Sequence, residues 1–209
     1  MMSVSQSYVW YVGYGSNLCE ERFLCYILGE KFKWGGKKAD ACKDKTPPKA
    51  NKPIRIPYSL YFAKNSCWWE DSGVAFISPE REPDENKWTL GRMWKITCEQ
   101  YEHVRRQEGK DWYNHEIYLE EEDGFPIRTI TNKEILTSYN RPSAGYLKTI
   151  GQEELGSALD TGQIQQVIEK NICPQRQISS AKRLTFKSCF AGFLLTNVIC
   201  NICRRIYLW

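Results

Sequence analysis

Long apolar runs are scarce in this chain of 209 residues. A membrane-spanning helix needs about 20 predominantly apolar residues. The most apolar segment, from Cys189 to Cys203, is shorter and is interrupted by Thr196, Asn197 and Asn201, so we expect no membrane span. The opening residues are polar and lack a basic n-region, which predicts no secretory leader and a cytoplasmic location.

Metal-ligating patterns are also sparse. The histidines, His103 and His115, lie outside any cluster of ligand residues. The nine cysteines are odd in number and show no regular framework, so we expect mostly reduced thiols, several of them small core side chains. Cys200 and Cys203 have C-x-x-C spacing but no second pair at zinc-site distance. We predict no metal site and no cofactor.

Strong charge of one sign is absent as well. The chain has 29 basic and 25 acidic residues and a net charge of +4, which does not argue for a nucleic-acid partner. Lysines concentrate between Lys31 and Lys52, and a solvated loop accounts for them. Gly13 and Gly15 lack both the third glycine of a dinucleotide loop and the Lys-Ser or Lys-Thr of a phosphate loop. The sequence therefore disfavours nucleotide-binding classes.

The chain does have the means to build a core, with 42% hydrophobic and 13% aromatic residues. Strand patterns outnumber helix patterns, which predicts an α+β fold: a small mixed β-barrel with flanking helices. The predicted strands are 7–12, 54–63, 73–78, 88–96, 112–120 and 125–131, and the predicted helices are 18–28, 98–106, 143–158 and 162–170.

Several single residues sharpen this prediction. Gly29 is expected to end the first helix, and Thr97 to cap the second, with Gln100 completing a capping box. Gly91 predicts a bulge or a barrel corner. The unbroken apolar run of strand 73–78 predicts burial on both faces.

The chain is expected to divide into a barrel domain, 1–175, and an apolar, cysteine-containing extension, 176–209. The extension predicts an extra element packed on the barrel, or a segment that binds a partner. The sequence leaves open whether the chain forms a homodimer or contacts another protein through this tail.

One short stretch, Tyr11 to Leu18, carries the strongest signal for function. It reads Tyr-Val-Gly-Tyr-Gly-Ser-Asn-Leu and follows a predicted strand. Its glycines would let the backbone adopt positive φ and approach a ligand. Successive N–H groups there would form a cup for a negative oxygen. An ordinary tight turn is the competing interpretation.

Further segments occur in a fixed order along the chain, and with this loop they resemble the gamma-glutamylcyclotransferase family over roughly residues 8–170. In that family a Tyr-Gly-Ser-Asn-Leu loop holds the gamma-glutamyl group, and a glutamate in a Glu-Gly pair is the general acid/base. The matching segments are Trp69 to Ile77, Leu90 to Ile96, Glu108 to Tyr113 and Ser138 to Leu147.

The resemblance implies a small mixed barrel and a metal-free enzyme acting on a small-molecule gamma-glutamyl peptide or amine. Such an enzyme cyclises the gamma-glutamyl group to 5-oxoproline and releases the amine. Glu108 would be the catalytic acid/base. The residues implied to bind the substrate are Tyr14, Gly15, Ser16, Asn17, Leu18, Tyr113 and Tyr139.

Glu108 suits this role if burial beside Trp112 and Tyr113 lifts its pKa. Contact with Arg105 or Arg106 would instead lower that pKa. The alternative function is a non-catalytic protein of the same fold that binds a small ligand and acts through a protein partner. The carboxylate at Glu108 favours the enzyme, because a binding protein has no need of it.

Overall fold

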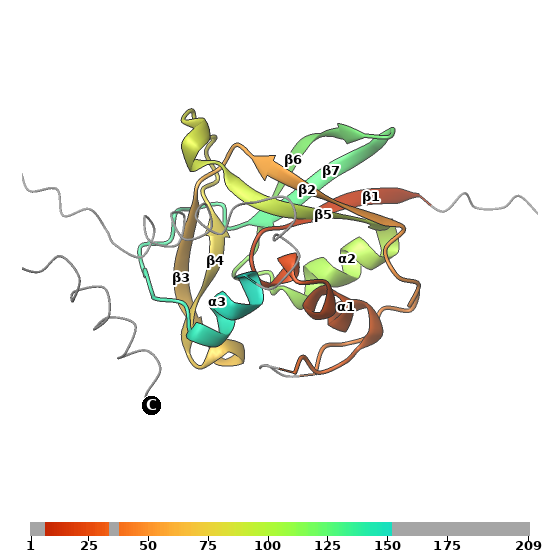
Figure 1. Ribbon diagram of the computed structural model, residues 1–209, viewed down its shortest axis with the longest axis horizontal. Helices are drawn as coiled ribbons and strands as arrows, with labels where there is room; N and C mark the ends of the chain where they lie inside the picture. Colours follow the sequence, from red (N-terminus) through yellow and green to blue (C-terminus); the bar gives the residue numbers. More distant parts are fainter. Residues whose placement is uncertain (1–6, 34–37, 152–209) are drawn as a thin grey trace, which may run out of the picture. The chain divides into compact units, whose positions relative to one another are not determined.

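The computed structural model describes residues 7–33 and 38–151. Seven strands in this part of the chain form two sheets (Figure 1). The five-stranded sheet has the order β2-β5-β1-β7-β6, and its strands are β1 (Tyr8–Gly13), β2 (Ala50–Ile56), β5 (Thr89–Thr97), β6 (His115–Glu122) and β7 (Phe125–Thr131). The two-stranded sheet pairs β3 (Leu60–Ser66) with β4 (Ser72–Ile77).

Three helices, α1 (Glu20–Leu28), α2 (Cys98–Gln107) and α3 (Ala144–Gly151), accompany these strands in the described residues. Figure 1 shows α1 and α2 on the same side of the five-stranded sheet, with α3 beside β4. Short 3-10 turns lie at η1 (Ser16–Leu18), η2 (Cys67–Trp69) and η3 (Glu85–Lys87). No described helix combines the length and the apolar character that crossing a bilayer requires.

The α+β class is therefore confirmed, but the sheet is not closed into a barrel. Among the described strands, β2 and β6 are edge strands with one partner each, and β3 pairs with β4 and forms one isolated bridge, from Ala63 to Tyr139. The predicted strand 54–63 is in fact two strands in different sheets. The chain leaves β2 at Ile56, passes Pro57 and enters β3 at Leu60, because proline has no N–H with which to continue a ladder.

Strand β1 lies at the centre of the five-stranded sheet. It pairs antiparallel with β5, from Tyr8 opposite Thr97 to Gly13 opposite Arg92, and parallel with β7. Every residue of β1 after Tyr8 is buried. The glycine loop that follows β1 therefore starts from a fixed point in the core.

Aromatic stacking fastens α1 to this sheet. Phe23 on α1 is fully buried and stacks on Trp94 of β5 with ring centroids 4.9 Å apart. Tyr11 of β1 stacks on the same phenylalanine at 5.7 Å. Aromatic pairs add stabilisation beyond their buried area, so α1 and the loop before it are held firmly against the sheet.

The predicted helix ends agree with the structure. Gly29 adopts a left-handed conformation with φ of 76° after α1, which glycine does without steric cost. Thr97 and Gln100 form the expected capping box, at 3.2 Å and 3.0 Å, at the start of α2. Strand β4 is buried throughout, as its apolar run predicts.

Gly91 does not mark a bulge, because β5 pairs in regular register on both sides. A Cβ atom there would lie 2.7 Å from Cγ1 of Val12, so glycine permits close packing between strands. The five described cysteines are free thiols, and Cys19, Cys25 and Cys42 are buried, as expected for reduced thiols. Helix 143–158 is described only to residue 151, and predicted helix 162–170 and extension 176–209 lie outside the described residues.

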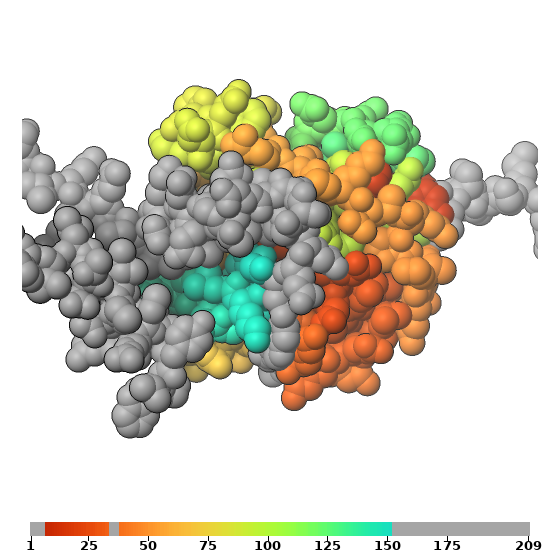
Figure 2. Space-filling view, in the orientation of Figure 1, coloured from red at the N-terminus to blue at the C-terminus, as the bar shows by residue number. Residues whose placement is uncertain are grey.

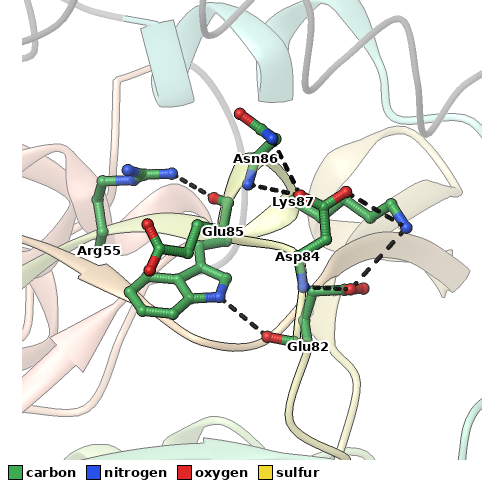
Figure 3. A network of polar contacts seen from close by, with 7 residues as sticks. Arg55, Glu82, Asp84, Glu85, Asn86 and Lys87 are labelled. Carbon is green, nitrogen blue, oxygen red and sulfur yellow. Dashed lines mark hydrogen bonds and ion pairs between the residues drawn. The ribbon is translucent and has the colours of Figure 1, made fainter.

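The connection between β4 and β5 carries a network of polar contacts (Figure 3). Asp84 caps η3 by accepting a hydrogen bond from the Asn86 amide at 3.0 Å. Lys87 lies 3.9 Å from Glu82 and 3.7 Å from Asp84. Figure 2 shows this connection, in yellow, at the surface of the molecule.

Candidate active site

The glycine loop and Glu108 meet directly, although 91 residues separate Asn17 from Glu108. The Asn17 side-chain amide donates a hydrogen bond of 2.6 Å to Oε1 of Glu108 and a second one, of 3.1 Å, to the Tyr11 hydroxyl. Its own Oδ1 is buried and has no partner among the described residues. A buried acceptor without a donor is uncommon in proteins.

Close packing, and not positive φ, explains the two glycines of the loop. Gly15 has φ of −110°, and Gly13 is not among the glycines with positive φ, so that expectation was wrong. A Cβ at Gly13 would lie 2.8 Å from the Asn17 Cβ, and one at Gly15 would lie 2.7 Å from the Tyr146 hydroxyl. Any side chain at either position would push the loop away from its neighbours.

The indole of Trp94 anchors the glycine loop to the five-stranded sheet. Its Nε1 donates a 2.9 Å hydrogen bond to the backbone carbonyl of Asn17. Trp94 is itself fully buried in the sheet. The residue that contacts Glu108 is therefore anchored to the core through its own main chain.

Glu108 is the C-terminal cap of α2, and its N–H donates to the Val104 carbonyl at 3.1 Å. Gly109 follows with φ of 83°, a conformation that lets the chain reverse. The N–H groups of Trp112 and Tyr113 both bond to the Gly109 carbonyl, at 3.1 Å and 3.0 Å. This turn brings both aromatic residues to the pocket that Glu108 also lines.

Two adjoining pockets, an outer lobe and an inner lobe (together called the cavity), lie at this meeting point and share Ser16, Glu108, Tyr113 and Tyr146 in their walls. The outer lobe measures about 340 Å³ and the inner lobe about 30 Å³. The inner lobe is large enough for one water-sized group. Aromatic side chains form much of the outer wall, namely Tyr26, Trp68, Trp69, Trp112, Tyr113 and Tyr146.

Burial raises the pKa of Glu108, while Arg22 and hydrogen bonds from Asn17 and Tyr26 partly oppose this rise. The residue is partly exposed, and because it lines both lobes we infer that this exposure is to the cavity. A raised pKa makes a carboxyl a better proton acceptor than it is in water.

The cation beside Glu108 is Arg22 of α1, and not the expected Arg105 or Arg106. Arg105 lies 3.1 Å from Glu102 and 3.3 Å from Glu116, and Arg106 is exposed. Sequence proximity misled here, because the helix turns both arginines away from the cavity. Arg22 is 3% exposed and contacts the outer lobe.

Two aromatic rings hold Arg22 in place. Its Nη2 donates to the Tyr26 hydroxyl at 2.9 Å, and its guanidinium lies 4.3 Å from the Tyr26 ring centre and 5.6 Å from the Trp68 ring centre. Cation–π contacts of this kind strengthen when they are shielded from water. Arg22 and Tyr26 were missed from the sequence, since nothing in an amphipathic helix pattern distinguishes a buried arginine.

Tyr146 of α3 is a second residue that the sequence reasoning missed as a site residue. Its hydroxyl oxygen accepts a hydrogen bond of 3.0 Å from the Ala75 N–H and interacts with the Ser16 N–H. Burial raises its pKa to about 12, so it keeps its proton. With its oxygen accepting from the backbone, the hydroxyl proton is free to donate into the cavity.

The other predicted site residues are placed differently. The rings of Tyr14 and Tyr113 line the inner lobe, and their hydroxyls donate to the carbonyls of Ile130 at 2.7 Å and Ala75 at 2.9 Å. Leu18 is buried beneath the loop and does not line either lobe. Tyr139 is 66% exposed, packs against Tyr61 and lies outside both lobes. Its hydroxyl therefore does not reach the cavity.

Within residues 7–33 and 38–151 no group of three or more His, Cys, Asp or Glu side chains could hold a metal ion.

Comparison with known proteins addresses the fold. The structure of uncharacterized protein LOC79017 from Homo sapiens matches with a TM-score of 0.52 and 16% identity, over 95% of this chain and 99% of that chain. The two proteins share one fold. This likeness confirms the predicted α+β fold, and at such low identity it shows the fold alone.

Weaker or shorter matches add context. The glutathione-specific gamma-glutamyl cyclotransferase from yeast matches with 14% identity and a TM-score of 0.38, over 79% of this chain and 97% of that chain, a score too low to carry an argument. Histone deacetylase 5 of Arabidopsis thaliana is 37% identical over 101 residues, which are 48% of this chain and 15% of that protein. No protein-family model matches the chain.

Proposed function

We propose that this protein is a gamma-glutamyl cyclotransferase that converts a gamma-glutamyl amine or peptide into 5-oxoproline and a free amine. The observation that carries the proposal is the 2.6 Å hydrogen bond between Asn17 of the glycine loop and the Glu108 carboxylate, at the wall that the two lobes share. The sequence resemblance supports the same reaction, and the shared fold is compatible with it.

Glu108 acts first as a base. It takes a proton from the substrate's α-ammonium, and the amine nitrogen then attacks the γ-carbonyl carbon to close a five-membered ring. The attack is intramolecular, so holding the substrate in a folded conformation removes much of the barrier.

The carbonyl oxygen becomes negative when the ring closes. The small inner lobe has room for such an oxygen, and the Tyr146 hydroxyl that lines this lobe is a candidate donor to it. Donors that are fixed before the reaction stabilise developing charge most effectively. Glu108, now protonated, gives its proton to the leaving nitrogen as the amide bond breaks. The restored carboxylate then takes the remaining extra proton from the ring nitrogen and passes it to the released amine, which leaves as an ammonium.

Arg22 moderates this cycle. Burial alone favours the protonated form of Glu108, whereas the buried guanidinium favours the carboxylate. The net shift of the Glu108 pKa is upward, the direction that suits a carboxyl acting both as base and as acid.

The test is to incubate the protein with gamma-glutamyl dipeptides, gamma-glutamyl amines and glutathione, and to measure 5-oxoproline. We expect release from at least one of these classes. Binding of a gamma-glutamyl compound with no 5-oxoproline from any of them would instead support the alternative, a non-catalytic ligand-binding protein.

A further inference from the structure

The aromatic and charged residues that line the outer lobe indicate which kind of leaving group this lobe can bind. Because Glu108 borders both lobes, a substrate whose reacting carbonyl lies at the inner lobe extends its leaving amine into the outer one. This inference rests on the proposed function. At about 340 Å³ the outer lobe is large enough for a ring-containing group.

Aromatic surface dominates the walls of the outer lobe. Trp68 follows β3 in η2, and Trp112 follows the turn at Gly109, so two distant segments each bring one partly exposed indole to the cavity. Indole faces favour flat apolar groups and cations. The lobe thus offers a surface for an aromatic body and for a positive charge.

Charge at the rim favours the same kind of ligand. The described charged residues that line the outer lobe are Arg22, Glu108 and Asp111. Arg22 is buried and is engaged by Tyr26, Trp68 and Glu108. Asp111 is exposed and forms no ion pair with the described residues. A carboxylate on a leaving group at the rim would be repelled by Asp111, and Arg22, the cation among the described lining residues, is already engaged.

We propose that the outer lobe is a subsite for a leaving amine that has an aromatic body, no carboxylate and a second, positively charged amino group. Trp68 and Trp112 contact the ring, and Asp111 at the rim attracts the distal ammonium. Gamma-glutamyl amino acids and glutathione, whose leaving groups carry a carboxylate, are poorer substrates for this site.

Three matched probes test the subsite: the gamma-glutamyl amides of p-xylylenediamine, tyramine and tyrosine. The last two differ only by a carboxylate, and the first has an aromatic ring with a second amine. We expect kcat/KM to fall in the order p-xylylenediamine, tyramine, tyrosine, by about two- to fivefold for each change of charge, because the rim is exposed to water. Equal values for all three, or the reverse order, would overturn the subsite.

The charge-reversal variant Asp111→Lys tests whether Asp111 at the rim causes the preference among the three probes. It should reverse the ratio between the p-xylylenediamine and tyrosine probes. The control is Glu120→Lys, which makes the same change in net charge at an exposed position of β6 away from the cavity, and which should keep the parent ratio. A parent-like ratio in Asp111→Lys would contradict the proposal.

Binding of the free amines tests the subsite independently of the reaction. If no probe releases 5-oxoproline, the proposed reaction fails, and calorimetry with p-xylylenediamine, tyramine and tyrosine then decides on the subsite. Tighter binding of p-xylylenediamine than of tyrosine, with loss of that preference in Asp111→Lys, supports the subsite without the reaction. Equal binding overturns it.

Discussion

Trp94 and Trp88 make the same kinds of contact in two different regions of the molecule. Each indole donates a 2.9 Å hydrogen bond to a backbone carbonyl, Trp94 to Asn17 and Trp88 to Glu82. Each has an arginine nearby, at 5.2 Å and 5.8 Å from the ring centre. Trp94 is fully buried under the glycine loop, whereas Trp88 is partly exposed in the connection of Figure 3.

The same contrast holds for two carboxylates. Glu108 has Arg22 and the Tyr26 hydroxyl beside it in the cavity. Glu116 of β6 accepts a 2.8 Å hydrogen bond from the Tyr101 hydroxyl and lies 3.1 Å from Arg128, and it does not line the cavity. Equivalent contacts thus occur in both regions, and burial is what gives those around the cavity their energetic weight.

The largest loss of stability is expected from Arg22→Met, which leaves Glu108 buried without its cation. The Arg22 guanidinium also donates to the Tyr26 hydroxyl, and losing a buried hydrogen bond from a charged group costs about 1.5–3 kcal/mol in the free energy of unfolding, to which the lost attraction for the Glu108 carboxylate adds. The matched control, Arg55→Met, removes a solvent-exposed guanidinium near Trp88 and should change stability by less than about 0.5 kcal/mol. Urea denaturation of both variants measures the difference.

This loss should depend on pH. Glu108 has a raised pKa in the folded protein, so it stabilises the fold fully below its unfolded pKa of about 4.3 and progressively less as the pH rises through the folded pKa. Removing Arg22 raises the folded pKa further. Arg22→Met should therefore lose most at neutral pH and least below about pH 4.3. An equal loss at both pH values would mean that Arg22 does not act on Glu108.

A smaller effect is expected from Trp94→Phe, which keeps an aromatic ring but leaves the Asn17 carbonyl without its donor. An unsatisfied buried carbonyl costs about 1–3 kcal/mol. Trp88→Phe loses the same kind of bond at the surface, where water replaces the indole, and should change stability by less than about 0.5 kcal/mol. Both variants are measured by thermal and urea unfolding. Similar losses of stability would show that burial does not distinguish the Trp94 hydrogen bond from the Trp88 hydrogen bond.

The smallest effect is expected from Lys87→Met in the surface network. Its ion pairs, at 3.9 Å and 3.7 Å, are exposed and long, and pairs of this kind contribute about 0–1 kcal/mol. Unfolding of this variant at low and high salt should be nearly the same. A marked loss at low salt would show that the connection between β4 and β5 contributes more than its exposure suggests.

The parts of the fold that the sequence predicts well are those set by local rules. Gly29, the Thr97 capping box and the apolar run of β4 each fix an element through neighbouring residues alone. The division of strand 54–63 could not be predicted, because it depends on which distant strand each half pairs with.

The site residues that could be predicted from the sequence were likewise those with a local signal. Asn17 and Glu108 were predicted through a motif resemblance and do lie together. Arg22 and Tyr146 were missed because their roles arise from contacts across the fold. Tyr139 was misplaced because two tyrosines of one segment have the same local signal, and tertiary packing brings only Tyr146 to the cavity.

The most direct test of the central claim compares Glu108→Gln with Glu116→Gln in single-turnover release of 5-oxoproline. Each variant removes one ionisable carboxyl that has an arginine and a tyrosine hydroxyl beside it. We predict a rate about 10²–10⁴-fold lower for Glu108→Gln, with substrate binding retained, and a rate near that of the parent protein for Glu116→Gln. Parent-like turnover by Glu108→Gln would show that another group carries the proton.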